Sequence, residues 1–217
     1  MNRSETLPSQ YTLGEEIANS ITHAVATGLS IAALVVLIVA AVSQGDAWHV
    51  VSFSIFGSSL ILLYLASTLY HSIPLERAKR FLKTLDHSAI FLLIAGTYTP
   101  FMLVSLRGTT GWIIFAVVWI LAVAGVVLKC CCVYRFKRLS LTIYLGMGWL
   151  CVLVMRDMYA SLSGLSLTFL ALGGLAYTLG VVFYVWKRLP YNHAIWHLFV
   201  IAGSTLHFFS VLHTLPA

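Results

Sequence analysis

Charged residues are scarce in this sequence. Only 9% of its 217 residues are Asp, Glu, Lys or Arg, against about 25% in ordinary soluble domains. The chain is also 60% hydrophobic, with a mean hydropathy of +0.93. This combination excludes a typical soluble globular domain and indicates a single bundle of membrane helices.

A cleavable signal and a paired-cysteine pattern are also missing. Residues 1–19 are polar and contain no apolar signal-peptide core, which predicts a short cytosolic tail that is not cleaved. Three of the four cysteines are consecutive, Cys130 to Cys132, and Cys151 lies in an apolar run. Neither a disulfide framework nor a CxxC zinc knuckle is therefore expected. We expect reduced thiols near the cytosol, with S-acylation of the triplet as an alternative in a host that has the enzymes.

Acidic residues are fewer than basic ones. The sequence has 7 Asp and Glu against 13 Lys and Arg, a formal net charge of +6, and a pI near 9.3. A basic balance is typical of nucleic-acid-binding proteins, but membrane proteins concentrate Lys and Arg in cytoplasmic loops. We therefore expect a membrane protein with no nucleic-acid partner.

Long apolar runs dominate what is present, and seven of them are long enough to cross a bilayer. They lie at about residues 20–42, 50–71, 87–106, 111–129, 139–155, 165–186 and 193–213. The sequence thus predicts an all-α integral membrane protein, with a seven-helix transmembrane domain at 20–217 behind the tail at 1–19. Thr12 and Glu15 fit a capping box that starts the first helix. Pro100 is expected to kink the third span, and close helix packing is expected at Gly146, Gly148, Gly173, Gly174 and Gly180.

Basic residues fall in alternate loops. The tail and three loops hold Arg3, Arg77, Lys79, Arg80, Lys83, Lys129, Arg135, Lys137, Arg138, Lys187 and Arg188. The opposite side holds only Arg107 and Arg156. The positive-inside rule therefore predicts a cytoplasmic N-terminus and an external C-terminus.

This topology brings most of the polar residues within the spans to the cytoplasmic ends. The first span begins with Glu16, Asn19 and His23, the second ends with Ser67 and His71, the third begins with Asp86 and His87, and the seventh begins with His193 and His197. Ionisable groups inside membrane spans are costly and mark functional sites. Residues four apart on a helix share a face, so His193 and His197 could offer two imidazoles to one metal ion.

Several of these residues also have a purely structural interpretation. Asp86 could be only the N-cap of the third span, because Asp is a favoured N-cap residue. His87 points about 100° away from Asp86 on a helix and is expected to be structural. His207 lies about 15 Å along the helix from His197, so it cannot share a metal ion with it.

The polar blocks together resemble the progestin and adipoQ receptor family, and specifically its bacterial branch, the haemolysin III proteins. The resemblance rests on Glu16-x-x-Asn19-x-x-x-His23, on Ser67 to His71, on Asp86, on Leu93 to Phe101 and on Arg188 to His197. It implies a zinc ion near the cytoplasmic face, held by His71, His193 and His197. It also implies that Asp86 holds the zinc-bound water, with Ser67 beside it. The short tails differ from those of the receptor members, which argues against an extracellular-hormone role for this chain.

Three neutral imidazoles leave one tetrahedral position open, as in catalytic zinc sites. Glu16, Asn19 and His23 are expected to support the ligands. The resemblance implies ceramidase-like hydrolysis of a lipid amide or ester, with membrane lipid as substrate or ligand and the bacterial inner membrane as location. Two other functions stay open: a regulator of membrane state that uses zinc as a structural staple, and a pore-forming haemolysin. Against a pore, no span outside the histidine cluster carries a charged stripe.

Overall fold

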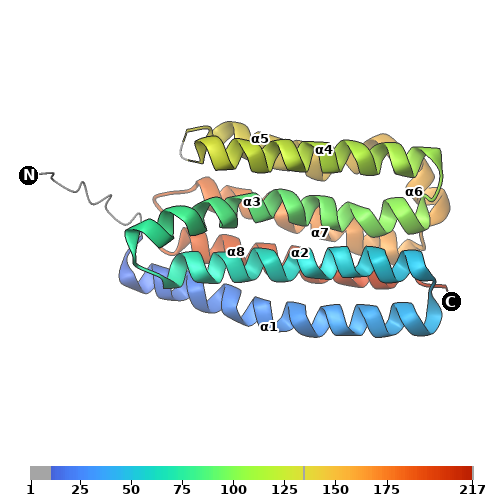
Figure 1. Ribbon diagram of the computed structural model, residues 1–217, viewed down its shortest axis with the longest axis horizontal. Coiled ribbons are helices and arrows are strands. Elements are labelled where there is room, and N and C mark those ends of the chain that lie inside the picture. Colours follow the sequence, from blue (N-terminus) through green and yellow to red (C-terminus); the bar gives the residue numbers. More distant parts are fainter. Residues whose placement is uncertain (1–10, 134, 217) are drawn as a thin grey trace, which may run out of the picture.

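The computed structural model describes residues 11–133 and 135–216, and this part of the chain is helical throughout its regular structure (Figure 1). Seven helical segments are long and apolar enough to cross a membrane, which confirms the predicted seven-helix bundle. The third and fifth segments are composite. The elements are α1 (Leu13–Gln44), α2 (Ala47–Ser72), α3 (Glu76–Pro100) with a π-helical extension (Phe101–Ser105), α4 (Thr109–Cys132), α5 (Lys137–Gly148), a 3₁₀ segment (Trp149–Val154), α6 (Met155–Ser161), α7 (Gly164–Val185) and α8 (Asn192–Leu212).

The helices run side by side along one axis, and the start of α1 and the end of α8 lie at opposite ends of the bundle (Figure 1). α1 packs on α2 and α8, α3 packs on α2 and α4, and α7 packs on α8. The most apolar windows of α2 and α3 are 56% and 67% buried, against 22% for α1 and α4. α2 and α3 therefore form the centre, and most of α1 and α4 faces outward. Residues 1–10, which make up half of the expected tail, lie outside the described residues, and the direction of insertion remains a prediction.

The start of α1 follows the sequence pattern. The backbone N–H of Glu15 donates to the Thr12 hydroxyl, and the Thr12 N–H donates to the Glu15 carboxylate at 2.8 Å. This confirms the predicted capping box, which satisfies two backbone donors that a helix start would otherwise leave unpaired. The helix that carries Glu16, Asn19 and His23 thus begins at a residue fixed by local sequence.

The third span begins earlier than predicted. α3 starts at Glu76, so Asp86 lies ten residues inside the helix and is not its N-cap. The N-cap interpretation of Asp86 is therefore wrong, and the residues assigned to a basic loop form the first turns of α3. The reason is that Glu, Arg, Ala and Lys are good helix formers, whereas hydropathy detects only the apolar part of a span.

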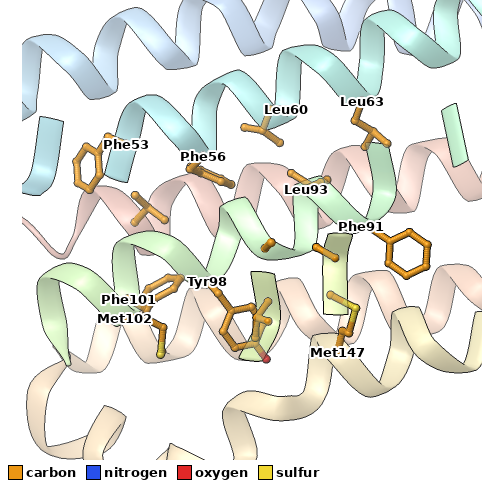
Figure 2. Close-up of a cluster of buried hydrophobic side chains, with 14 of the residues drawn as sticks. Phe53, Phe56, Leu60, Leu63, Phe91, Leu93, Tyr98, Phe101, Met102 and Met147 are labelled. Carbon is orange, nitrogen blue, oxygen red and sulfur yellow. The ribbon is translucent and has the colours of Figure 1, made fainter. Parts of the chain in front are cut away.

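The helices pack through large apolar side chains and through two of the expected glycines. Figure 2 shows the buried cluster, with Phe53, Phe56, Leu60, Leu63, Phe91, Leu93, Tyr98, Phe101, Met102 and Met147. A Cβ added at Gly173 would meet the His207 ring, and one added at Gly180 would meet Trp196 and Phe199. The prediction was right for these two glycines. It was wrong for three others, because a Cβ would meet open space at Gly146, Gly148 and Gly174.

Candidate metal centre

Three imidazoles meet at the end of the bundle where α1, α3 and α8 begin and α2 ends. His71 comes from the last turn of α2, and His193 and His197 come from the first two turns of α8. Each offers a ring nitrogen, and the three atoms lie within 4.8 Å of one another. Among the described residues, this is the one group of three or more His, Cys, Asp or Glu side chains close enough to share a metal ion.

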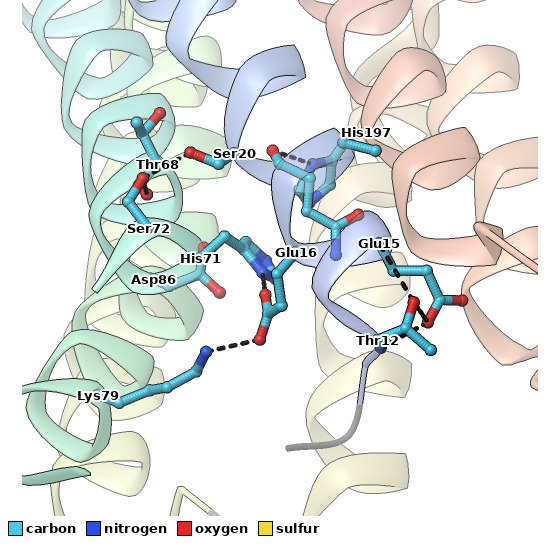
Figure 3. A network of polar contacts seen from close by, with 12 residues as sticks. Thr12, Glu15, Glu16, Ser20, Thr68, His71, Ser72, Lys79, Asp86 and His197 are labelled. Carbon is cyan, nitrogen blue, oxygen red and sulfur yellow. Dashed lines mark hydrogen bonds and ion pairs between the residues drawn. The ribbon is translucent and has the colours of Figure 1, made fainter. Parts of the chain in front are cut away.

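Glu16 orients the first imidazole. Its Oε2 lies 2.5 Å from Nδ1 of His71, and its Oε1 accepts from Lys79 Nζ at 2.6 Å (Figure 3). Because the carboxylate accepts, Nδ1 of His71 carries the proton and Nε2 keeps its lone pair. Nε2 is buried without a hydrogen-bond partner. A carboxylate behind a histidine is the usual support of a metal ligand.

The backbone of α1 orients a second imidazole. Nδ1 of His197 lies 3.2 Å from the carbonyl oxygen of Asn19 and 3.2 Å from the hydroxyl of Thr22. A carbonyl oxygen can only accept, so Nδ1 donates and Nε2 is left as the available ligand atom. His23 stacks on His197 with ring centroids 3.5 Å apart. His23 and Asn19 thus both contact His197, and their support of a metal ligand stays a prediction.

The turn before α8 sets the depth of His193 and His197. Tyr191 precedes the helix in a left-handed conformation, with φ of 55°. Its N–H donates to the Glu15 carboxylate at 3.1 Å, which ties the start of α8 to the start of α1. Asn192 then donates through Nδ2 to the carbonyl oxygen of Phe183 on α7 at 2.9 Å. These bonds fix the first turn of α8, and with it His193.

Asp86 and Ser67 lie at the same end of the bundle as the three histidines. Figure 3 shows the Asp86 side chain projecting from α3 toward His71 and Glu16. Only 8% of Asp86 and 1% of Ser67 is exposed. Asp86 makes a charge contact of 3.2 Å with Nδ1 of His87, without hydrogen-bond geometry. Its carboxylate also interacts electrostatically with His71 and His197, which places a negative charge beside the imidazole cluster.

The donor set fits a zinc ion. Zinc prefers imidazole nitrogen, and three protein ligands are the number found in catalytic sites. Buried polar atoms normally have hydrogen-bond partners, yet most of the buried side-chain atoms without one belong to these histidines and to residues at the same end of the bundle. They include His71 Nε2, His193 Nδ1, Ser67 Oγ, both His23 nitrogens and the Asn19 amide. The unpartnered nitrogen and oxygen atoms therefore suit a site that holds a metal ion together with its water or another polar ligand.

Comparison with known proteins identifies the family of this chain. A family model described as "Haemolysin-III related" matches residues 11–208. The chain belongs to the haemolysin III family. It is 53% identical to "Hemolysin-3 homolog" of Bacillus subtilis (strain 168) over 202 residues, 93% of this chain and 95% of the relative. It is 49% identical to "Hemolysin-3" of Bacillus cereus over 203 residues, 93% of each chain.

A human protein shows that the similarity extends beyond bacteria. "Monocyte to macrophage differentiation factor" of Homo sapiens is 31% identical over 205 residues, which cover 91% of this chain and 83% of the relative. The resemblance seen in the sequence is thus confirmed at the level of the family.

Three tyrosines of this haemolysin III protein were missed by the sequence argument. Tyr11 stacks on His193 with ring centroids 5.1 Å apart, Tyr184 lies 5.9 Å from the same ring, and Tyr70 contacts His71 at 4.7 Å. Burial raises the pKa of Tyr11, so its hydroxyl stays protonated at neutral pH. One signal was available for Tyr11, which directly precedes the capping box of α1.

Replacing Glu16 tests whether it supports a metal ligand. We expect Glu16→Gln to weaken zinc binding about 10–100-fold, because loss of a carboxylate behind a ligating histidine has that effect. The measurement is a zinc competition titration with a chromophoric chelator. Glu76→Gln is the matched control, because Glu76 is an exposed glutamate in the first turn of α3. An unchanged zinc affinity in Glu16→Gln would contradict this role.

Proposed function

We propose that this haemolysin III protein is a zinc-dependent hydrolase that cleaves a lipid amide or ester at one membrane surface. One observation carries the proposal: two imidazoles donate hydrogen bonds to Glu16 and to the Asn19 carbonyl, which leaves their other nitrogens for a metal ion, and an acidic side chain lies beside them. A purely structural zinc site needs only the residues that bind the metal. The additional carboxylate, Asp86, is what a hydrolytic site requires.

The chain's own residues have distinct parts in such a reaction. Asp86 takes a proton from the attacking water, whose oxygen forms a bond to the acyl carbon. The bond from that carbon to the amide nitrogen or ester oxygen then breaks, and Asp86 returns the proton to the leaving atom. Ser67 lies one helical turn before His71, and its hydroxyl can donate to an oxygen of the reacting group. Water is consumed, and a fatty acid and the deacylated lipid are released.

Zinc bound to His71, His193 and His197 would polarise the acyl carbonyl and lower the pKa of water. The contact of Nδ1 of His71 with Glu16 and that of Nδ1 of His197 with the Asn19 carbonyl leave Nε2 of each ring for the metal. His23 covers one face of His197, which excludes solvent from that side. The arrangement suits a lipid that enters sideways from the surrounding leaflet.

A structural zinc staple is the second candidate. The histidines join α2 to α8, and Glu16 adds α1, so bound metal would hold three helices together. A pore is the third, because two relatives carry the printed name hemolysin. Dye release from liposomes that contain the purified protein separates a pore from the other two functions.

The direct test of the proposal combines zinc removal with a lipid assay. Purified protein is assayed against a ceramide and a diacyl phospholipid before chelation, after chelation, and after zinc is restored. We expect release of fatty acid that is lost with the metal and recovered with it. Absence of turnover in zinc-replete protein on both lipid classes would favour the staple instead.

We further propose that the metal site faces the cytoplasm of a bacterial inner membrane. Basic residues gather at this end of the bundle, and positive charge is retained on the cytoplasmic side. A reporter that is active only in the cytosol should therefore be inactive when fused behind α8. The same reporter fused ahead of α1 is the control and should be active. The reverse result would place the site outside.

A further inference from the structure

A cavity of about 290 Å³ opens beside the histidines and has a positively charged lining. Lys83 from α3, Arg138 from α5 and Lys187 from the α7–α8 connection contribute the charge. Of the ten described residues that line the cavity, none is acidic. Two helices and one connection between helices thus each place a basic side chain in the same cavity.

This convergence differs from the general basic character of this end of the bundle. Arg77 and Arg80 lie on the first turns of α3, and Arg188 directly follows Lys187, yet none of the three lines the cavity. All three are exposed. The positive-inside rule accounts for Lys and Arg at this end, but it does not select which of them face a common hollow.

The cavity leads to the candidate metal centre. His193 is part of its lining, together with Tyr11, Tyr70 and Tyr184, which contact the imidazoles of His193 and His71. Lys187 Nζ lies over the Tyr184 ring, 4.6 Å from its centroid. The remaining walls include apolar side chains, Leu141 and Val185. A ligand in the cavity would meet cations, hydroxyl groups and an apolar surface, and one of its ends would lie near His193.

We propose that this cavity binds the phosphate of an anionic acyl lipid, which makes anionic phospholipids the substrate class. Lys and Arg are the usual partners of phosphate oxygens. In a phosphoglyceride the acyl ester is only a few bonds from the phosphate, so a headgroup held by the cations leaves an ester carbonyl close to the histidines. Binding stands on the cavity alone; cleavage to a fatty acid and a lysolipid rests on the function proposed above.

Binding is measured without cleavage. The zinc-loaded protein in neutral detergent is titrated with a dialkyl ether phosphatidylglycerol, which has no ester to cut, and with the corresponding ether phosphatidylcholine. The cavity variant is Lys83→Gln/Arg138→Gln/Lys187→Gln. The matched control is Arg77→Gln/Arg80→Gln/Arg188→Gln, which removes the same charge from the same end. Zinc content and a single gel-filtration peak verify that each variant is folded, and Arg138→Gln alone serves as a milder variant.

We expect wild-type protein to prefer the anionic lipid, and the cavity variant to bind it on the order of 100-fold more weakly. That figure follows from about fivefold per cation near an anionic surface. The control variant should lose less than about fivefold, and Arg138→Gln should lose about fivefold. Equal losses in the two triple variants, or equal binding of both lipids by wild-type protein, would overturn the proposal.

Inorganic phosphate alone distinguishes the two sources of a phosphate ligand. If it stabilises the protein against heating as strongly as the ether lipid does at equal concentration, the ligand is soluble phosphate and the lipid assignment is overturned. We expect only weak stabilisation, because free phosphate does not use the apolar wall. Loss of hydrolysis with intact lipid binding would count against the hydrolase and not against this site.

Discussion

Asp86→Asn is expected to retain its zinc and to lose about 10²–10⁴-fold in lipid turnover, the usual cost of removing general acid–base catalysis. Asp86 is not one of the three proposed ligands, and its carboxylate lies beside them from α3. The amide of Asn has a similar shape but accepts no proton at neutral pH. Turnover and zinc content are measured on the same purified sample.

Asp157→Asn is the matched control for this experiment. Asp157 is exposed on α6 and should be replaceable without effect on either quantity. If zinc-replete Asp86→Asn keeps full turnover, Asp86 is not the proton acceptor and its proposed part in the reaction is wrong. If Asp86→Asn loses the metal as well, Asp86 is part of the metal site itself and the division of parts proposed here is wrong.

Replacing all three histidines is expected to abolish stoichiometric zinc binding. His71→Ala/His193→Ala/His197→Ala removes every nitrogen of the cluster, so the loss should exceed the 10–100-fold expected of a supporting residue. A metal ion held by these histidines would join α2 to α8, so its loss should also lower thermal stability, by about 4 kcal/mol if the free zinc concentration is 1,000 times Kd. Zinc per chain and melting temperature in detergent are the two measurements.

His207→Ala provides the control on the same helix. His207 is buried on α8, donates through Nδ1 to the Gly203 carbonyl oxygen at 2.7 Å, and stacks on Tyr177. Its loss disturbs packing but touches none of the proposed ligands. It should therefore keep one zinc per chain. Stoichiometric zinc in the triple variant would mean that the metal is bound elsewhere.

The number of spans and the depth of the site follow from the sequence. Seven apolar runs of sufficient length leave little choice of architecture, and alternating topology puts Glu16, His71, His193 and His197 at one end. Depth is a one-dimensional property, because it depends only on the distance of each residue from the end of its span. The sequence therefore predicts that these groups share a level in the membrane.

The sequence does not determine in the same way which helices pack against one another. That α1 packs against both α2 and α8, so that Glu16 reaches His71 and Asn19 reaches His197, depends on the packing of whole helices. The early start of α3 was missed because charged residues in a helix and in a loop have the same hydropathy. The open surroundings of Gly146 and Gly174 were missed because glycine occurs both on helix faces that pack against a neighbour and on faces that point outward, and the sequence does not separate the two.

The basic cavity shows the same limit. Lys83, Arg138 and Lys187 were recognised from sequence as basic residues on one side of the membrane. Nothing in their positions separated them from Arg77, Arg80 and Arg188, because convergence on one hollow is a property of the packed helices.

X-ray absorption at the zinc edge of the purified wild-type protein tests the three-histidine centre most directly. The account predicts one zinc per chain, with three imidazole nitrogens at about 2.0–2.1 Å and one further oxygen ligand at a similar distance. That oxygen shows that a coordination position is open to water or substrate. Sulfur ligands at about 2.3 Å, as Cys130 to Cys132 would give, or the absence of bound zinc, would contradict it.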